Sequence, residues 1–241
     1  MDWFLWLHAE HGIKLTIFYD HWDRGRFISG IWTTIHLSFV TIVLSIVIGI
    51  IGAWFQKSRF VWIRIIVQGY IQFFRNTPPL IQLYFFYFAM DTFLSGIFNI
   101  HGGILGSYGW AVVSLSFFAG AFNVEIFRAG VEAVPESTVE SAISLGYSRR
   151  QIYQYVTLPL AFRVCLPALN NNLINLIKTT TVAYAIAVPE TLYVANQIWS
   201  DEYNVLEMMN VVWVIYIIIV GFLVWLMHRW ELSTRIPGFG Q

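Results

Sequence analysis

Three polar side chains lie on one side of an otherwise apolar segment. Asn171, Asn175 and Lys178 are spaced i, i+4 and i+7, which places them on one face of an α-helix. Thr179 and Thr181 follow directly. Polar groups are costly inside a bilayer and mark solute paths by default. The Lys178 ammonium could bind a solute carboxylate. The alternative is a buried structural lysine paired with a neighbouring carboxylate or with helix carbonyls.

A second polar cluster, Arg75-Asn76-Thr77-Pro78-Pro79, interrupts another apolar segment. Pro78 and Pro79 lack backbone donors, and Thr77 before them is pushed toward extended geometry. A broken helix at membrane depth is tolerated where it faces protein or a wet cavity, and in transporters it often marks the solute site. The alternative is a packed kink, in which Arg75 still needs a partner for its permanent charge. Two amides around the break are weaker candidates for lining a solute path: Gln72 and Gln82.

The remaining polar residues indicate no catalytic or metal chemistry. Glu125 and Arg128 are three residues apart, and we expect a structural ion pair near the cytoplasmic face rather than a ligand contact. The sequence has no HExxH, no GxSxG and no paired intramembrane Asp, so an enzyme is not expected. It has no CxxC-type cluster, and Cys165, the single cysteine, is interpreted as a packing residue. The net charge is zero, which gives no indication of nucleic-acid binding.

The composition predicts that a bilayer surrounds the elements that position these residues. Of 241 residues, 57% are hydrophobic and only 12% are charged, about half the charged share of a soluble domain. We therefore expect an all-α, polytopic membrane protein with five transmembrane helices. The expected spans are residues 27–56, 65–90, 109–131, 160–188 and 208–227.

The distribution of basic residues predicts the orientation of the chain. Lys and Arg are absent from the loops 91–108 and 189–207. They occur in the other loops and in the C-terminal tail, at Lys57, Arg59, Arg64, Arg149, Arg150, Arg229 and Arg235. By the positive-inside rule the N-terminus lies outside and the C-terminus lies in the cytoplasm.

The chain divides into three parts on this basis. Residues 27–230 form the transmembrane domain, and 231–241 form a cytoplasmic tail. Residues 1–26 lack the order of a cleavable signal peptide. They form either a short interfacial helix or a loosely ordered terminus; the helix would be built from Trp3, Phe4, Trp6 and Leu7.

The segment 136–159 is hydrophilic and falls on the cytoplasmic side. Ser137 to Glu140 fits a capping box, as does Ser148 to Gln151. Gly146 stands where a left-handed residue ends a helix. We expect a helix over about 138–145, a glycine turn, and a second helix from about 149. So short a helix needs a docking surface for its apolar face; that surface is either the chain's own bundle or a cytoplasmic partner.

Four stretches of the sequence resemble one family. E-S-A-x-x-L-G-x(9)-V-x-L-P, from Glu140 to Pro159, resembles the EAA loop of permease subunits of bacterial ABC importers. FFRNTPPLIQLYFFYFAM, VEIFRAGVEAVP and INLIKTTTVAYAIAVPETLY resemble the polar amino-acid permeases of the histidine, glutamate, glutamine, arginine and opine class. The match covers roughly residues 28–230 in the right order. Thr179 departs from the family pattern, which often has an acidic residue or Asn there.

The resemblance implies a type I ABC importer permease fold in which the segment 136–159 is a cytoplasmic coupling helix seated on an ATPase subunit. Gly146 would allow the turn, and Glu140 and the surrounding surface would make the contact. The residues assigned to coupling are Glu140, Ser141, Ala142, Leu145, Gly146 and Arg149. Those assigned to the substrate path are Lys178, Asn175, Asn171, Arg75, Gln72, Thr179 and Thr181. Those given structural roles are Pro78, Pro79, Glu125, Arg128 and Pro159.

The resemblance also implies the partners and the location. The protein would be a multi-pass subunit of the bacterial cytoplasmic (inner) membrane. Its partners would be an ATPase dimer that binds ATP-Mg, a second permease chain, identical or related, an extracytoplasmic binding protein, and membrane lipid. The chain itself has no Walker motif, so it would bind no cofactor. The expected cargo is a polar L-amino acid, with acidic amino acids or their amides favoured. A gradient-driven transporter or channel is the alternative, but we find no internal repeat.

Overall fold

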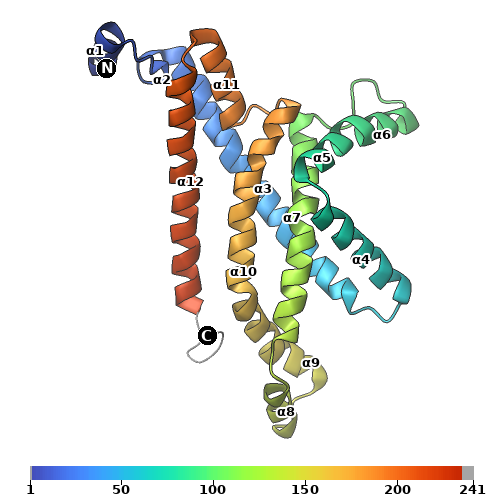
Figure 1. Ribbon diagram of the computed structural model, residues 1–241. Helices are drawn as coiled ribbons and strands as arrows, with labels where there is room; N and C mark the ends of the chain where they lie inside the picture. The colour runs from blue at the N-terminus through green and yellow to red at the C-terminus, as the bar shows by residue number, and fades with distance from the viewer. Residues whose placement is uncertain (1, 235–241) are drawn as a thin grey trace. The chain divides into compact units, whose positions relative to one another are not determined.

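The computed structural model describes residues 2–234, and within that range the chain forms only helices and connecting turns. Arg235 and the rest of the expected cytoplasmic tail from there on lie outside the described residues. The elements (Figure 1) are α1 (Asp2–His11), α2 (Thr16–Tyr19), α3 (His21–Gln56), α4 (Val61–Asn76), α5 (Pro79–Tyr84), η1 (Phe85–Met90), α6 (Asp91–Phe98), α7 (Ser107–Glu132), α8 (Glu136–Ser144), α9 (Arg149–Ile152), η2 (Tyr153–Thr157), α10 (Leu158–Thr179), η3 (Thr180–Ile186), α11 (Thr191–Glu202) and α12 (Val205–Thr234).

Five helical segments are long and apolar enough to cross a membrane, which confirms the expected number. They are His21–Gln56, Pro79–Phe98, Ser107–Glu132, Arg149–Ile186 and Val205–Ser233. Many of their large apolar side chains are exposed; Phe39 and Trp213 are 66% exposed. Exposed apolar surface is what lipid-facing helices present, because the bilayer is their solvent.

The second span lies further along the chain than the expected residues 65–90. Helix α4 ends at Asn76, Thr77 is extended (φ −111°, ψ 136°), and α5 begins at Pro79. The break is therefore confirmed, with the physical reason that a residue before proline avoids the helical region. The span itself begins at Pro79 and continues to Phe98, so Arg75 belongs to the separate helix α4.

The helices divide into two compact units, so far as their residues are described. The first comprises Met1–Thr41, Pro79–Leu115 and Leu176–Phe222, and the second comprises Ile42–Pro78, Ser116–Asn175 and Leu223–Gln241. A core of apolar residues from α2, α3, α11 and α12 lies in the first unit: Ile17, Phe27, Val194, Ala195, Ile198, Met208 and Val212. In the second unit, α4 and α7 share a smaller core of Val67, Ile71 and Val124.

Helix α11 was not expected, because residues 189–207 were interpreted as a loop. Glu190 begins it as the N-cap residue and accepts hydrogen bonds from the backbone N–H of Leu192 (3.0 Å) and Tyr193 (2.8 Å). The helix buries Val194, Ala195 and Ile198 in the core of the first unit. Tertiary burial therefore forms a helix where the charge pattern suggested only a connection.

The N-terminal segment forms a helix, in agreement with one of its two expected conformations. Trp3 and Trp6 in α1 are 60% and 50% exposed. The placement of α1 at the membrane interface stays a prediction.

Glycines let α3 and α7 approach closely within the second unit. A Cβ added to Gly49 would lie 2.5 Å from the Cβ of Asn123, and one added to Gly52 would meet the side chain of Val124. Small residues at helix interfaces permit such contacts in membranes. The two helices are also joined there by the Asn123 amide, which donates to Ser45 Oγ (3.2 Å).

We expect Gly49→Ala to destabilise the protein by about 1–3 kcal/mol, because overpacking forces the two backbones apart. The measurement is the temperature at which Cys165 becomes reactive to a fluorescent thiol reagent, since this single cysteine is buried. Gly69→Ala is the matched control, because a Cβ on Gly69 meets nothing within 4 Å. Equal unfolding temperatures for the two variants would show that the α3–α7 contact is not tight.

Candidate functional sites

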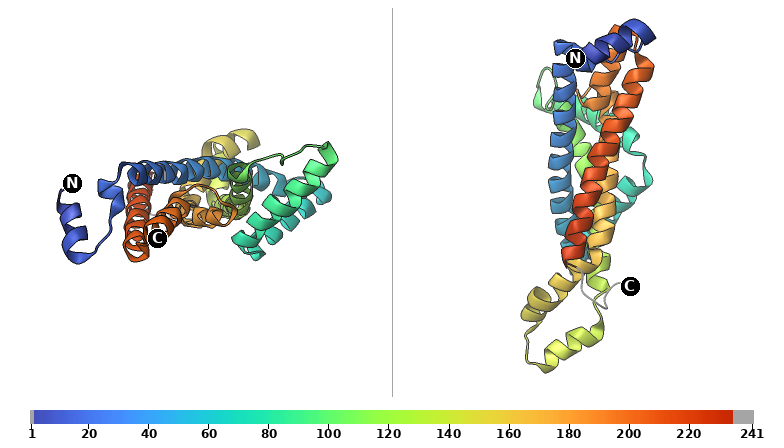
Figure 2. Two further views of the ribbon diagram at one scale, coloured as in Figure 1. Left: turned by 90° about the horizontal axis from the view of Figure 1, so that it is seen from above. Right: turned by 90° about the vertical axis from the view of Figure 1, so that its left-hand side faces the viewer.

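The segment between α7 and α10 forms a helical hairpin. In Figure 1 and in the right-hand view of Figure 2, α8 and α9 lie beyond the ends of α7 and α10. The turn is a left-handed glycine: Gly146 has φ +84°, its N–H donates to Ile143 O (2.9 Å), and the N–H of Tyr147 donates to Ala142 O (3.2 Å). These two bonds form a Schellman motif. The expected helix–glycine–helix arrangement is confirmed.

One of the two expected capping boxes is present. Ser148 Oγ accepts the N–H of Gln151 (3.4 Å), and the Gln151 side chain accepts the N–H of Ser148 (2.9 Å). The other is wrong: α8 begins at Glu136 after an extended Pro135, so Ser137 and Glu140 lie inside the helix. The proline carbonyl accepts the N–H of Thr138 (3.1 Å), which starts the helix two residues earlier than the serine pattern suggested.

The surface of the hairpin remains largely uncovered. Of the expected apolar face, Ala142 is buried, but Ile143 is 58% exposed, and Leu145 beside it is 77% exposed. Glu140, Ser141, Gly146 and Arg149 are exposed as well. After α9 the chain passes through one turn of π-helix, Tyr153–Thr157, into α10, which contains Pro159. The hairpin is therefore continuous with the fourth span and leaves apolar side chains for a further surface to cover.

The polar residues of α10 fall on two sides of the helix. Asn171, Asn175 and Lys178 are exposed, as their common face predicts. Within the part of the chain that the structure describes, the Lys178 ammonium has no ion-pair partner and no hydrogen bond. The structural alternative of an internal carboxylate partner is therefore absent there. Thr181 Oγ donates to Lys178 O (2.8 Å), and Thr179 is half-buried.

The other side of α10 carries a polar network that the sequence patterns did not single out. The Asn172 amide donates to Asn123 Oδ1 (2.8 Å) and to Ala119 O (3.1 Å), and Asn123 in turn donates to Ser45. Asn123 is fully buried. This network ties α3, α7 and α10 together within the second unit, so Asn172 has structural partners while Asn171 is exposed.

The guanidinium of Arg75 has partners in the second unit. It lies 3.7 Å from Glu125 Oε2 and 5.3 Å from the centroid of the Phe122 ring. The expected pair of Glu125 and Arg128 is confirmed at 2.9 Å, and Arg128 also binds Glu132 at 2.8 Å. The four residues form a charge network, which makes Arg75 a weaker candidate than Lys178 for holding a solute carboxylate.

The two amides near the helix break differ in exposure. Gln72 is exposed and accepts a hydrogen bond from the Asn76 amide (2.9 Å). Gln82 is 1% exposed, so it does not line an open surface of this chain. Pro78 is exposed and Pro79 is half-buried at the break itself.

A buried carboxylate organises the first unit, and the sequence reading missed it. Glu190 is fully buried; besides its two backbone donors it accepts the hydroxyl of Tyr216 (2.9 Å). Thr34 of α3 binds the Thr191 hydroxyl (2.8 Å) and accepts the Thr191 N–H (3.0 Å). Burial raises the pKa of Glu190, and the two backbone N–H donors oppose that shift. The cluster joins α3, α11 and α12.

We expect Glu190→Ala to lower the free energy of unfolding by about 2–4 kcal/mol, because it removes a helix cap and leaves buried donors without an acceptor. The measurement is a far-UV circular dichroism melt of the purified chain in detergent. Asp201→Ala, on the exposed end of the same helix, should change the melt far less. If both variants melt alike, the cluster is not a stabilising element.

Comparison with known proteins gives consistent matches over most of the chain. The sequence profile of the family described as "Binding-protein-dependent transport system inner membrane component" matches residues 24–231. The octopine transport system permease protein OccM of Rhizobium radiobacter is 28% identical over 80% of this chain and 79% of its own length. The histidine/lysine/arginine/ornithine transport system permease protein HisM of Salmonella typhimurium is 28% identical over 87% of this chain and 90% of its own.

A solved structure agrees with both. A chain of a crystal structure described as an amino acid ABC transporter with histidines superposes with a TM-score of 0.78 at 27% identity, over 87% of this chain and 94% of that chain.

Proposed function

This chain belongs to the family of inner-membrane components of binding-protein-dependent transport systems, and we propose that it is the permease subunit of an ATP-driven importer for polar L-amino acids. The relatives carry octopine or basic amino acids by their names, and the solved neighbour is an amino-acid transporter. The observation that carries the energy coupling is the exposed hairpin of α8 and α9, with Ile143 and Leu145 uncovered.

The ATPase is a separate protein in this proposal. The sequence contains no Walker motif, so nucleotide hydrolysis has to come from a partner. The hairpin docks on that partner, and Gly146 permits the turn between the two docking helices. Movement of the ATPase then reaches α10 directly, because α9 leads through the π-helical turn into that span. A second permease chain completes the path, and a binding protein delivers the solute.

The orientation follows from the same arrangement. The hairpin and the loop after α3 face the cytoplasm, and the N-terminus faces outside. The basic residues Lys57, Arg59 and Arg64 support this, as do Arg149 and Arg150 next to the hairpin. Reaction of the variant Ser144→Cys, in a Cys165→Ser background, with an impermeant thiol reagent tests the assignment. Labelling in intact cells would contradict it; labelling only after lysis supports it.

The cargo is proposed to be an acidic amino acid or its amide. The exposed face of α10 offers one ammonium and two amides and no carboxylate. An ammonium at the path favours a solute with a carboxylate. Position 179 has no acidic residue, so the side chain of a basic solute would find no counter-charge on this face.

The deciding experiment is ATP hydrolysis by the reconstituted complex with its binding protein. Glutamate, aspartate, glutamine and asparagine should stimulate hydrolysis, whereas arginine, lysine and octopine should not. Stimulation by the basic amino acids alone would overturn the cargo and leave the importer assignment intact. The importer assignment itself would be overturned if no ATPase subunit co-purified with the chain and uptake were insensitive to ATP depletion.

A further inference from the structure

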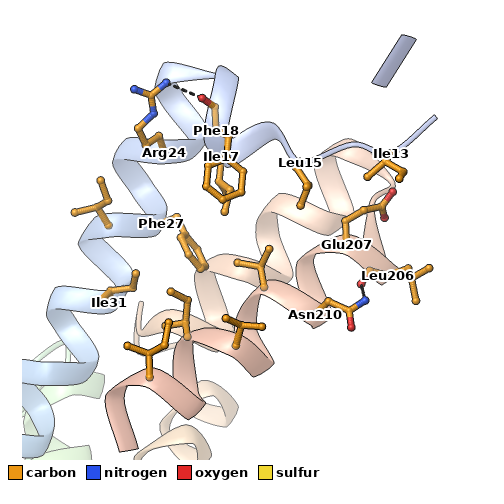
Figure 3. Close-up of a pocket in the computed structure, with 15 residues that line it drawn as sticks. Ile13, Leu15, Ile17, Phe18, Arg24, Phe27, Ile31, Leu206, Glu207 and Asn210 are labelled. Atoms are coloured by element: carbon orange, nitrogen blue, oxygen red, sulfur yellow. Dashed lines mark hydrogen bonds between the residues drawn. The ribbon is translucent and has the colours of Figure 1, made fainter. Parts of the chain in front are cut away.

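A cavity of about 920 Å³ opens between the N-terminal segment and α12, within the first unit (Figure 3). We name it the N-terminal cavity. Its wall is apolar except for Arg24, Glu207 and Asn210, and its apolar lining residues are Ile13, Leu15, Ile17, Phe18, Phe27, Ile28, Ile31, Leu206, Val211, Val214, Ile215 and Ile218. Phe27 is 4% exposed, whereas Leu206 and Ile218 are 75% and 58% exposed. Part of the wall is therefore packed against other residues of this chain, and part of it is exposed apolar surface that nothing in the described chain covers.

The position of the cavity along the helices matches one leaflet of a bilayer. Its residues on α12 run from Leu206 to Ile218, which is about 18 Å of helix, and half of a hydrocarbon core is about 15 Å. Its residues on α3 begin at Arg24, in the first turn of that helix, and Trp22 in the same turn is 74% exposed. Exposed tryptophan at the end of a span is typical of the headgroup level. The cavity thus opens at the interface and extends into the hydrocarbon.

A guanidinium with spare donors stands at the shallow end of the cavity. Arg24 Nη2 donates to Phe18 O (3.3 Å), the bond drawn in Figure 3. In the described part of the chain it has no carboxylate partner. Arg26 nearby differs, because Asp23 and Asp201 hold it at 2.7 and 2.8 Å. Arg24 is therefore a free cation beside an apolar cavity, a combination suited to an anionic headgroup on a hydrocarbon tail.

The carboxylate of the cavity lies away from that cation. Figure 3 shows Glu207 on the opposite side of the cavity from Arg24. Glu207 Oε1 accepts the backbone N–H of Lys14 (3.1 Å). A phosphate at Arg24 is thus kept apart from the negative charge. A free polar amino acid is a poor occupant, because the deep wall offers it no hydrogen-bonding partner.

We propose that a membrane phospholipid occupies the N-terminal cavity, with an acyl chain along α3 and α12 and its phosphate bound by Arg24. The lipid fills the space between the N-terminal segment and the fifth span. This site is independent of the solute path and of the coupling hairpin.

The test is native mass spectrometry of the purified full chain in detergent, titrated with phosphatidylglycerol. Ile218→Trp fills the deep end of the cavity and should weaken lipid binding about tenfold or more. Each methylene of the acyl chain that loses its contact lowers the affinity about fourfold. Ile217→Trp is the matched control. It is the neighbouring residue, it is 51% exposed against 58%, and it does not line the cavity. This control should bind the lipid as the wild type does.

The headgroup is tested separately. Arg24→Gln should weaken binding of phosphatidylglycerol about fivefold, and Arg24→Lys should retain most of it. Diacylglycerol, which has the chains without phosphate, should bind the wild type and Arg24→Gln equally. Inorganic phosphate alone should not bind.

Three results would overturn the proposal. The first is equal lipid binding by Ile218→Trp and Ile217→Trp. The second is equal affinity of the wild type for phosphatidylglycerol and diacylglycerol. The third is loss of a dimer of chains, rather than of lipid, in Ile218→Trp, which would make a second copy the occupant.

Discussion

Gly146→Asp is expected to leave the protein in the membrane and to abolish solute-stimulated ATP hydrolysis by the complex. Gly146 has φ +84°, and a Cβ there meets nothing within 4 Å of this chain. The substitution therefore costs the chain itself only about 1–2 kcal/mol of backbone strain. Its larger effect is a charge and a side chain at the centre of the exposed hairpin, where the proposed docking brings a partner close.

The control for this variant has the same strain elsewhere. Gly12 also has positive φ (+66°) with open space around it, and it lies outside the residues that match the family profile. Gly12→Asp should insert, bind its partners and support hydrolysis normally. Gly146→Asn keeps the shape without the charge and should be intermediate. The measurements are membrane content, co-purification of the ATPase, and hydrolysis in reconstituted vesicles. Wild-type transport by Gly146→Asp would refute the coupling role of the hairpin.

The features that the sequence predicted correctly depend on local rules. Proline fixes the break after Asn76 because it excludes its predecessor from the helical region, whatever the rest of the chain does. Glycine at 146 ends α8 because it accepts a left-handed conformation without steric cost. The apolar spans follow from the thickness of the bilayer. Each of these constraints acts within a few residues or within one helix.

The features that the sequence did not predict depend on partners far away in the chain. From the sequence, Glu190 is an acidic residue in a predicted loop. Its role follows only from the structure, in which it accepts a hydrogen bond from Tyr216, 26 residues later. Asn172 could not be distinguished from Asn171 and Asn175 by type, and only its contact with Asn123 on α7 shows it to be structural. The capping box predicted at Ser137 is absent for a different reason: α8 already begins at Glu136, directly after the extended Pro135. The spacing of residues along the sequence shows which side chains share a face of a helix, but not which other helix that face contacts.

The candidate solute path shows the same division. Helical spacing placed Asn171, Asn175 and Lys178 together, and the structure leaves all three exposed. Arg75 was grouped with them by charge, yet its guanidinium pairs with Glu125 and lies over the ring of Phe122. Lys178 is therefore the stronger of the two candidate cations for a solute carboxylate, and the proposal for the cargo depends on it.

Lys178→Met is expected to raise the solute concentration that gives half-maximal ATP hydrolysis by about 10- to 100-fold. The reason is the loss of a charge-assisted hydrogen bond to the solute carboxylate, which contributes about 1.5–3 kcal/mol. Methionine keeps the unbranched chain as far as the ε carbon and removes the ammonium. Since the ammonium has no internal partner in the described residues, its removal should leave the thermal stability of the purified chain unchanged or slightly higher.

Arg163→Met is the matched control, because Arg163 is an exposed cation on the same helix, about 22 Å away along its axis. It should not change the dependence on solute. The two roles considered for Lys178 give opposite results. A structural charge would lower the unfolding temperature in Lys178→Met and leave the half-maximal concentration as in the wild type, whereas a solute contact changes that concentration and spares the stability. Lys178→Arg sharpens the distinction: a structural pair tolerates the guanidinium, but a path fitted to a small ammonium does not.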